Sequence, residues 1–293
     1  MADAAHIATD KKLEEMEKHL TEIYEKAAED VERKSKSFFK RFEKKDEEKK
    51  KLVESGALPE SEYLKWRKDN LMKSKKWKEL KESISADLLH VHETAQAYIN
   101  GKLAEIYALN YNSVGDYIES KIKGYSFSLI DAHTVQNLST SKKSLLPTRK
   151  VAKGKAVAWD VQHINAEVLQ GILQGKSIPK IAQSLRKVAE MDKKASIRTA
   201  RTCITSAENK GRIDAMKEAE KSGIVIKKVW ISTNDDRTRE SHADLGGTTA
   251  DIDEAFDGEY GDIMFPGDPS ADPCEVYNCR CTLGTKIEGF KKR

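Results

Sequence analysis

The feature that most constrains this chain of 293 residues is a highly charged N-terminal segment with a regular apolar stripe. Residues 10–82 are roughly half charged, with acids and bases interleaved. Lys and Glu recur at spacings of three and four, and such pairs stabilise exposed helices. Apolar residues recur at the same spacings, which places them on one side of a helix. We therefore predict long helices here. The stripe consists of Leu13, Met16, Leu20, Ile23, Ala27 and, with some drift, Val31.

A break at residues 55–63, SGALPESEY, divides this segment into two helices. Gly56 and Pro59 end the first helix, and Ser61 is positioned to cap the second. The second helix has its own apolar stripe of Trp66, Leu71, Trp77 and Leu80. We interpret the segment as a long helical hairpin with a solvated face. A coiled coil that binds a partner is compatible with this interpretation.

The helical pattern continues with less charge to residue 124, so residues 1–124 are predicted to form a helical arm that docks onto a partner. Residues 125–158 are irregular and basic, and we predict loops or short strands for them. They form either a solvated linker or a surface that contacts DNA phosphates, which clustered bases without acids favour. The candidate DNA-contacting bases are Lys142, Lys143, Arg149, Lys150, Lys153 and Lys155.

Residues 159–293 are predicted to combine helices with a small sheet. Helical patterns end at Gly175 and Gly223, and Ser177 is positioned to cap a helix between them. The segment IVIKKVWIS after Gly223 is β-branched, contains an aromatic residue and is too short for a helix, so it predicts a strand. We expect an α+β fold: an extended helical N-terminal region, then a helical bundle and a small C-terminal β-rich unit.

The chain shows no export or membrane signal. Its first twenty residues lack the apolar core of a secretion signal. No run approaches the roughly 20 apolar residues of a membrane span. We expect synthesis in a reducing cytoplasm, where four cysteines favour free thiols or a metal over disulfides. The net charge of +4 does not by itself indicate a nucleic-acid partner.

Three of the four cysteines, Cys274, Cys279 and Cys281, lie close together near the end of the chain. With His242 as a fourth ligand they would form a closed structural zinc site. Cys279 and Cys281 in a strand would point to opposite faces, however, so both can bind one ion only if the backbone bends. Two alternatives stay open: buried thiols that pack the sheet, and an oxidised pair formed after cell lysis.

The sequence favours a protein that is not an enzyme. His242, Asp235 or Asp236, and a cysteine could be combined into a catalytic group. No nucleophile turn surrounds any of the four cysteines, however. The acidic stretch 251–262 departs from a calcium-binding EF-hand loop at its fifth and sixth positions.

Several C-terminal motifs occur in a fixed order: ART at 200–202, Gly223 before a strand with KVW at 228–230, DRTRESH at 236–242, Phe256, PGDP at 266–269 and NCRC at 278–281. Together, over about residues 160–285, they resemble the Mu F-like phage head morphogenesis family, also called minor head or minor capsid proteins. One departure is Cys203, which stands where the family commonly has Glu or Gln. The motif residues are Arg201, Trp230, Asp236, Arg239, His242 and Asn278.

The resemblance implies a virion protein inside the head of a tailed double-stranded DNA phage, near the portal vertex, assembled in the host cytoplasm. It implies a part in procapsid assembly and in DNA packaging or ejection. The implied partners are the portal protein, the major capsid or scaffold protein, and double-stranded DNA bound weakly and non-specifically, with no membrane during assembly. The alternative is a virion-delivered enzyme, a nuclease or transferase-like effector built on the C-terminal domain.

Overall fold

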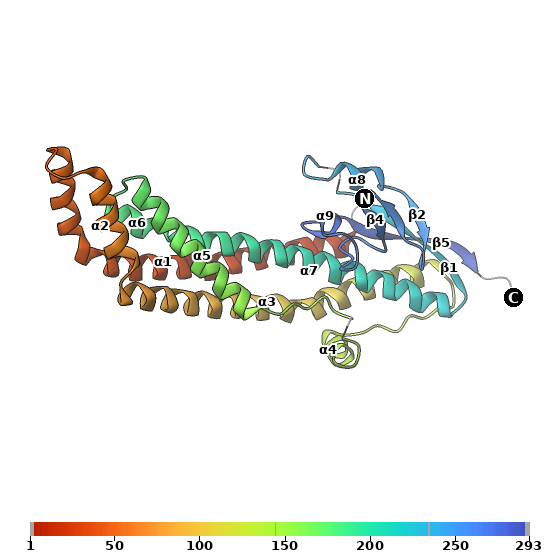
Figure 1. Ribbon diagram of the computed structural model, residues 1–293. Coiled ribbons are helices and arrows are strands. Elements are labelled where there is room, and N and C mark those ends of the chain that lie inside the picture. The colour runs from red at the N-terminus through yellow and green to blue at the C-terminus, as the bar shows by residue number, and fades with distance from the viewer. Residues whose placement is uncertain (1–2, 144, 234, 291–293) are drawn as a thin grey trace. The chain divides into compact units, whose positions relative to one another are not determined.

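The computed structural model describes residues 3–143, 145–233 and 235–290 (Figure 1). Contacts divide the chain into two compact units that are interleaved in sequence. Unit 1 takes Met1–Lys18, Ala97–Arg149 and Ile197–Arg293, and unit 2 takes His19–Gln96 and Lys150–Ser196. The predicted boundaries at 124 and 158 follow changes in sequence character, and the packing units cut across them.

Most of the described chain is helical, and the α+β class is confirmed. Three helices, α1, α3 and α7, each contribute residues to both units. In α1, the predicted stripe is buried at Met16, Leu20, Ala27 and Val31. The helices are α1 (Ala4–Glu54), α2 (Glu60–Met72), α3 (Lys75–Lys121), α4 (Ala132–Ser141), α5 (Lys153–Leu173), α6 (Ile178–Ser184), α7 (Arg186–Lys221), α8 (Glu240–Asp244) and α9 (Pro273–Val276).

The predicted second N-terminal helix is two helices, α2 and α3. The break comes after Lys73, and the Ser74 hydroxyl accepts a hydrogen bond of 3.1 Å from the backbone N–H of Trp77. No Gly or Pro lies at this break, so the sequence pattern did not predict that the helix ends here. Ser61 does not cap α2 as predicted, because Pro59 occupies the N-cap and Ser61 lies in the first turn.

Residues 125–158 also differ from the prediction of loops or short strands. They contain α4, whose N-cap Asp131 accepts a hydrogen bond of 2.7 Å from the backbone N–H of Thr134. Val135 of α4 is fully buried, and α5 already begins at Lys153. A capping residue and a buried apolar side chain thus stabilise a short helix in a segment for which loops were predicted.

Unit 2 is a helical bundle with a continuous apolar core. Helices α5 and α6 pack together, and α2 packs on α5 (Figure 1). The rings of Phe38, Phe39 and Trp77 lie within 6.0 Å of one another, centroid to centroid. The remaining core includes Leu71, Ile84, Leu88, Ile164, Val168, Ile172, Ile178, Ile181, Leu185 and Val188.

Unit 1 contains a three-stranded antiparallel sheet of order β2-β1-β5, made of β1 (Ile224–Ile231), β2 (Thr249–Asp251) and β5 (Thr282–Phe290). The predicted strand after Gly223 is confirmed as the central strand β1, which pairs from Ile224 with Phe290 to Ile231 with Thr282. A separate hairpin joins β3 (Phe256–Gly258) and β4 (Gly261–Ile263). Alternate residues of β1 are buried, among them Trp230.

Over the three described stretches of chain, no helix combines the length and the apolar character that crossing a membrane requires.

Candidate metal centre

The strongest concentration of chemically distinctive side chains in unit 1 is formed by His242, Cys279 and Cys281. His242 lies on α8, and the cysteines lie in the irregular turn between α9 and β5. Asn278 in this turn has a φ of 56°, a left-handed conformation that Asn tolerates better than most residues. Because the cysteines precede β5 rather than lie within it, the backbone bends and both side chains are buried on one side.

The distances among these side chains match those of a metal site. Nδ1 of His242 lies 3.6 Å from Sγ of Cys279 and 3.6 Å from Sγ of Cys281. A tetrahedral zinc ion with Zn–S bonds of about 2.3 Å and Zn–N bonds of about 2.0 Å requires a sulfur–nitrogen distance of roughly 3.5 Å. All three donor atoms lie within 4.8 Å of one another. The two nitrogen–sulfur distances therefore match those of a zinc site.

A carboxylate orients the imidazole from the opposite side. Nε2 of His242 lies 2.8 Å from Oε2 of Glu275, and both side chains are almost completely buried. A proton on Nε2 is then donated to Glu275, which leaves Nδ1 as the free donor atom facing the two sulfurs. Metal-binding histidines generally have such a carboxylate partner, which fixes the tautomer and the ring orientation.

The two thiols form a coupled pair. A hydrogen bond from Cys279, together with the nearby His242, lowers the pKa of Cys281 to about 5 despite its burial. The same hydrogen bond and the burial raise the pKa of Cys279. The pair thus holds one thiolate readily, and a bound cation would favour the loss of the second proton.

Helix α7 holds the turn that carries the cysteines. Thr205 donates a hydrogen bond of 2.7 Å to the carbonyl of Cys279. One turn further along, Asn209 donates to the carbonyls of Pro266 and Cys281 at 3.1 and 3.3 Å and accepts from the backbone N–H of Leu283 at 2.8 Å. These contacts position the backbone of the turn that carries both sulfurs.

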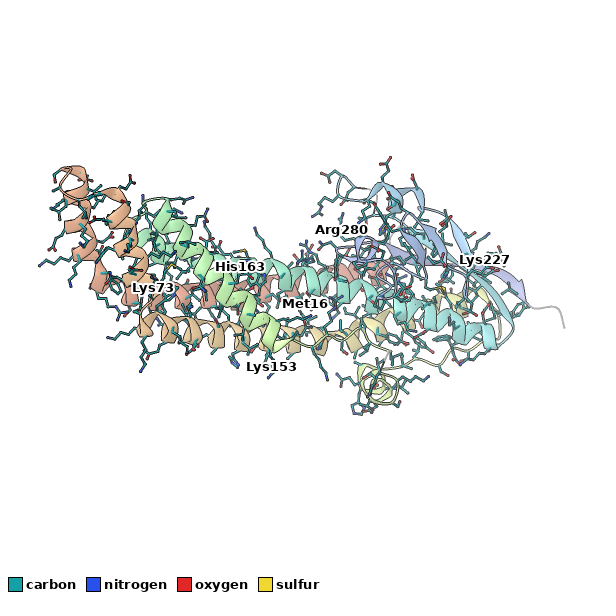
Figure 2. The ribbon with its side chains drawn as sticks, viewed as in Figure 1. Met16, Lys73, Lys153, His163, Lys227 and Arg280 are labelled. Atoms are coloured by element: carbon teal, nitrogen blue, oxygen red, sulfur yellow. The ribbon has the colours of Figure 1, made fainter. Side chains whose placement is uncertain are left out.

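The intervening residue, Arg280, is labelled in Figure 2. Its guanidinium donates two hydrogen bonds of 2.6 Å to the carboxylate of Asp235, in the loop that leads to α8. This bidentate ion pair connects the loop before α8, the helix that carries His242, to the turn that carries the cysteines. Arg239 donates a further hydrogen bond to the carbonyl of Tyr277.

The motif residues have different surroundings in the structure. Arg201 donates hydrogen bonds of 2.5 and 2.9 Å to Glu17 of α1. Trp230 is buried with its ring edge-to-face against His242, at 5.2 Å between ring centroids. Asp236 is exposed in the loop before α8. Gly267 of the PGDP motif has a φ of 78°, and a Cβ there would lie 2.9 Å from the backbone N of Ser206.

Cys274, predicted as one of four ligands with Cys279, Cys281 and His242, lies apart from this centre. Among the described residues, the ligand atoms that lie close enough to share an ion with His242 are those of Cys279 and Cys281, and not that of Cys274. Cys274 is exposed on α9, whereas Cys203 is buried in α7 and its burial raises its pKa. A cavity of about 10 Å³ borders the centre, enough for about one water molecule as the fourth ligand.

Sequence reasoning missed Glu275, Thr205 and Asn209. Glu275 is one acid among many in this part of the chain, and its pairing with His242 spans 33 positions. The signal that could have found Thr205 and Asn209 is their spacing of four, which places both on one face of α7.

The six predicted DNA-contacting bases are divided between the units. Lys142, Lys143 and Arg149 belong to unit 1, and Lys150, Lys153 and Lys155 belong to unit 2. Arg149 is half-buried and lies 5.8 Å from the ring centroid of Tyr277, and Lys153 pairs with Glu93 at 2.6 Å. The other four are exposed. DNA contact stays a prediction, and these four are the most accessible of the six.

The C-terminal region is similar to known proteins. The sequence model described as "Phage Mu protein F like protein" matches residues 162–284, which include His242, Cys279 and Cys281. The chain is 29% identical over 214 residues to the minor head protein GP7 of Bacillus phage SPP1, covering 72% of this chain and 67% of that protein.

Two bacterial proteins are also similar. The chain is 33% identical over 133 residues to the NAD(+)–arginine ADP-ribosyltransferase EFV of Enterococcus faecalis, covering 44% of this chain and 26% of that protein. It is 27% identical over 158 residues to the uncharacterized protein YqbB of Bacillus subtilis, covering 47% of this chain and 51% of that protein. This chain therefore spans about a quarter of the first and about half of the second. No solved structure matches it.

Proposed function

Because this chain belongs to the Mu F-like family of phage minor head proteins, we propose that it is bound inside the phage head near the portal vertex, where it acts in procapsid assembly and in DNA packaging or ejection. Head morphogenesis follows from the family. We add to it three proposals: the position at the portal vertex, the role in DNA packaging and the role in DNA ejection.

The observation that carries this proposal is the extent of the similarity to minor head protein GP7. That similarity covers 72% of this chain, which is more than residues 162–284 of the family match. It therefore includes helical sequence outside the C-terminal region. The helices supply large charged faces for a protein partner, for instance the exposed lysines and glutamates between residues 40 and 51 of α1. The partners we propose are the portal protein and the major capsid or scaffold protein.

The test is to quantify this protein in purified heads by mass spectrometry. We expect a few copies in heads assembled with the portal protein and a large loss, at least tenfold, in heads assembled without it. Equal amounts in both would contradict portal association but leave the head location intact. Absence from both kinds of head would contradict the head location itself.

DNA is the second ligand that we propose, bound through phosphates. Replacing Lys142, Lys143, Lys150 and Lys155 by Ala should weaken binding to random duplex DNA by about tenfold or more and flatten its salt dependence. The matched control replaces four exposed lysines of α1 that are interleaved with acids, Lys40, Lys44, Lys45 and Lys51. Equal effects of the two sets would mean that the acid-free segment is only a linker.

A virion-delivered enzyme is the alternative function, and the name of the enterococcal relative makes it testable. We propose a structural role instead, because the similarity to that enzyme covers only 26% of its length. Incubation with labelled NAD⁺ and an arginine-rich protein should transfer no label. Transfer that stops when His242 is replaced would support the enzyme.

We further propose that His242, Cys279 and Cys281 bind one Zn²⁺ ion, with water in the position that three protein ligands leave open. The matching distances and the Glu275 partner support it. Such an ion would join α8 to the turn before β5, two segments with little regular structure of their own, and so stabilise the C-terminal part of unit 1.

A further inference from the structure

A second group of buried polar side chains lies within unit 2, where four helices meet. Nε2 of His92, on α3, lies 3.7 Å from Oδ2 of Asp160 and 3.6 Å from Oδ2 of Asp192. Asp160 is on α5 and Asp192 on α7, so each of three helices contributes one side chain. Tyr24, on α1, places its hydroxyl 3.0 Å from the other ring nitrogen of His92, Nδ1.

The two carboxylates are buried without adequate partners. The Asp160 side chain is 1% exposed and the Asp192 side chain 8%. Within the described part of the chain, both oxygens of Asp160 and Oδ2 of Asp192 have no hydrogen-bond partner. Even a protonated His92 would supply one positive charge for two carboxylates. Buried charges in proteins are normally paired or bound to a metal, so these two carboxylates require a further cation or a retained proton.

We propose that His92, Asp160 and Asp192 bind a divalent transition-metal ion, Mn²⁺ or Zn²⁺, within the helical bundle. An ion with bonds of about 2.0–2.2 Å to tetrahedral ligands requires ligand atoms roughly 3.4 Å apart, close to the distances from Nε2 to the two carboxylate oxygens. Imidazole with carboxylates suits Mn²⁺ and Zn²⁺. Bundle interiors, where side chains of facing helices converge, are common places for such sites.

The fourth helix completes the arrangement. If Nε2 binds the ion, the proton of His92 is on Nδ1 and is donated to the Tyr24 hydroxyl at 3.0 Å. Tyr24 therefore orients the ring of His92 as Glu275 orients the ring of His242. The ring nitrogens are exchanged: Tyr24 contacts Nδ1 of His92, whereas Glu275 contacts Nε2 of His242. The ligands also differ in kind: two oxygens and a nitrogen here, two sulfurs and a nitrogen in unit 1.

The difference in ligands permits a test on the full chain as purified. Mn²⁺ has little affinity for thiolates, so an electron paramagnetic resonance titration with Mn²⁺ reports the oxygen-containing site while the sulfur-containing site is left alone. We expect one bound Mn²⁺ per chain, with nitrogen hyperfine coupling from His92. No binding up to millimolar Mn²⁺ and no Zn²⁺ bound beyond the sulfur site would overturn the proposal, as would bound Mn²⁺ without nitrogen coupling.

Variants locate the ion. Asp160→Asn should weaken Mn²⁺ binding at least tenfold, and Glu190→Gln, an exposed acid on the same helix as Asp192, should leave it unchanged. If Asp160→Asn does not fold, Tyr24→Phe is the second variant: it removes the hydroxyl partner of Nδ1 and should weaken binding while keeping the ring in place. Unchanged Mn²⁺ affinity in a folded Asp160→Asn protein would show that Mn²⁺ binds elsewhere and would overturn the proposal.

Discussion

Arg212 of α7 donates two hydrogen bonds, of 2.6 and 2.7 Å, to the carboxylate of Asp3 near the start of the chain. The same guanidinium donates to Oδ1 of Asn110 at 3.0 Å and to the carbonyl of Leu283 at 3.1 Å. One fully buried arginine therefore joins the beginning of the chain, α3, α7 and β5 within unit 1.

Replacing Arg212 by Ala should be severely destabilising. The loss leaves buried acceptors of Asn110 and Leu283 unpaired. It also removes the cation 3.4 Å from the buried carboxylate of Glu208, and breaking a buried ion pair from one side costs about 3–5 kcal/mol. Urea unfolding measures the change in free energy of unfolding. Arg33→Ala is the control, because that arginine is exposed and its ion pair with Asp30 is worth at most about 1 kcal/mol. Similar effects of the two changes would contradict the role given to Arg212.

The same contact predicts an acid-sensitive contribution to stability. Burial raises the pKa of Asp3, but the hydrogen bonds and charge of Arg212 outweigh it and lower the pKa to about 2. The pKa is therefore lower in the folded chain than its ordinary value of 3.8, and the stabilisation is present above pH 3.8 and is lost as the pH falls towards 2. Asp3→Asn should destabilise the protein at pH 6, and this difference should shrink at pH 3. A difference that does not change with pH would contradict the prediction.

Two helical glycines should respond oppositely to alanine. A Cβ on Gly211 of α7 would lie 2.5 Å from the carbonyl oxygen of Tyr107 on α3, so Gly211→Ala should cost about 1–3 kcal/mol. Gly101 of α3 has no described atom within 4 Å of such a Cβ, and Ala there should stabilise by about 0.5–1 kcal/mol. Thermal unfolding of both variants measures the contrast. Stabilisation by both would mean that α3 and α7 are not in close contact at Tyr107.

The zinc proposal predicts a difference among the cysteines. Cys279→Ser and Cys281→Ser should each abolish stoichiometric zinc in the reduced protein and lower the melting temperature, whereas Cys274→Ser should retain one zinc per chain. Glu275→Gln should weaken zinc binding by about 10–100-fold. Elemental analysis and competition with a chelator measure these outcomes. Zinc lost from Cys274→Ser as well would restore the four-ligand site expected from the sequence.

Lys228 should make stability rise in alkaline solution. Its Nζ donates to the carbonyl of Met264 at 2.7 Å, and burial, followed by repulsion from Lys217, lowers its pKa to about 8. Because its ordinary pKa is 10.5, the unfolded chain binds more protons between pH 8 and 10.5, so folding becomes more favourable as the pH rises. Lys228→Met should remove this increase. Lys227→Met, on the exposed side of β1, is the control and should not remove it.

The long helices and strand β1 could be predicted because their signals are local. Apolar spacings of three and four describe a helix face within a few turns, and IVIKKVWI has the composition of a strand. The break before Ser74 and the short helix α4 depend on single capping hydrogen bonds, which composition does not reveal. The interleaved units could not be predicted, because they depend on contacts between distant segments.

The candidate site could be predicted only in part. Histidine and cysteine are rare and chemically distinctive, so His242, Cys279 and Cys281 stood out in the sequence. Cys274 was included because it is near in sequence, but α9 leaves it on the surface. The group of His92, Asp160 and Asp192 has no sequence signal, because its members are common residue types far apart in the chain that converge only in the folded bundle.

The chain passes between its two units four times, at residues 18–19, 96–97, 149–150 and 196–197. Three of these passages lie within the uninterrupted helices α1, α3 and α7. Neither unit is therefore a contiguous stretch of gene. A recombination event that exchanged only the C-terminal half between related phages would give a chimaeric protein in which each unit combines helices from both parents. Whether that protein folds would depend on how well the packing surfaces of these helices match within each unit.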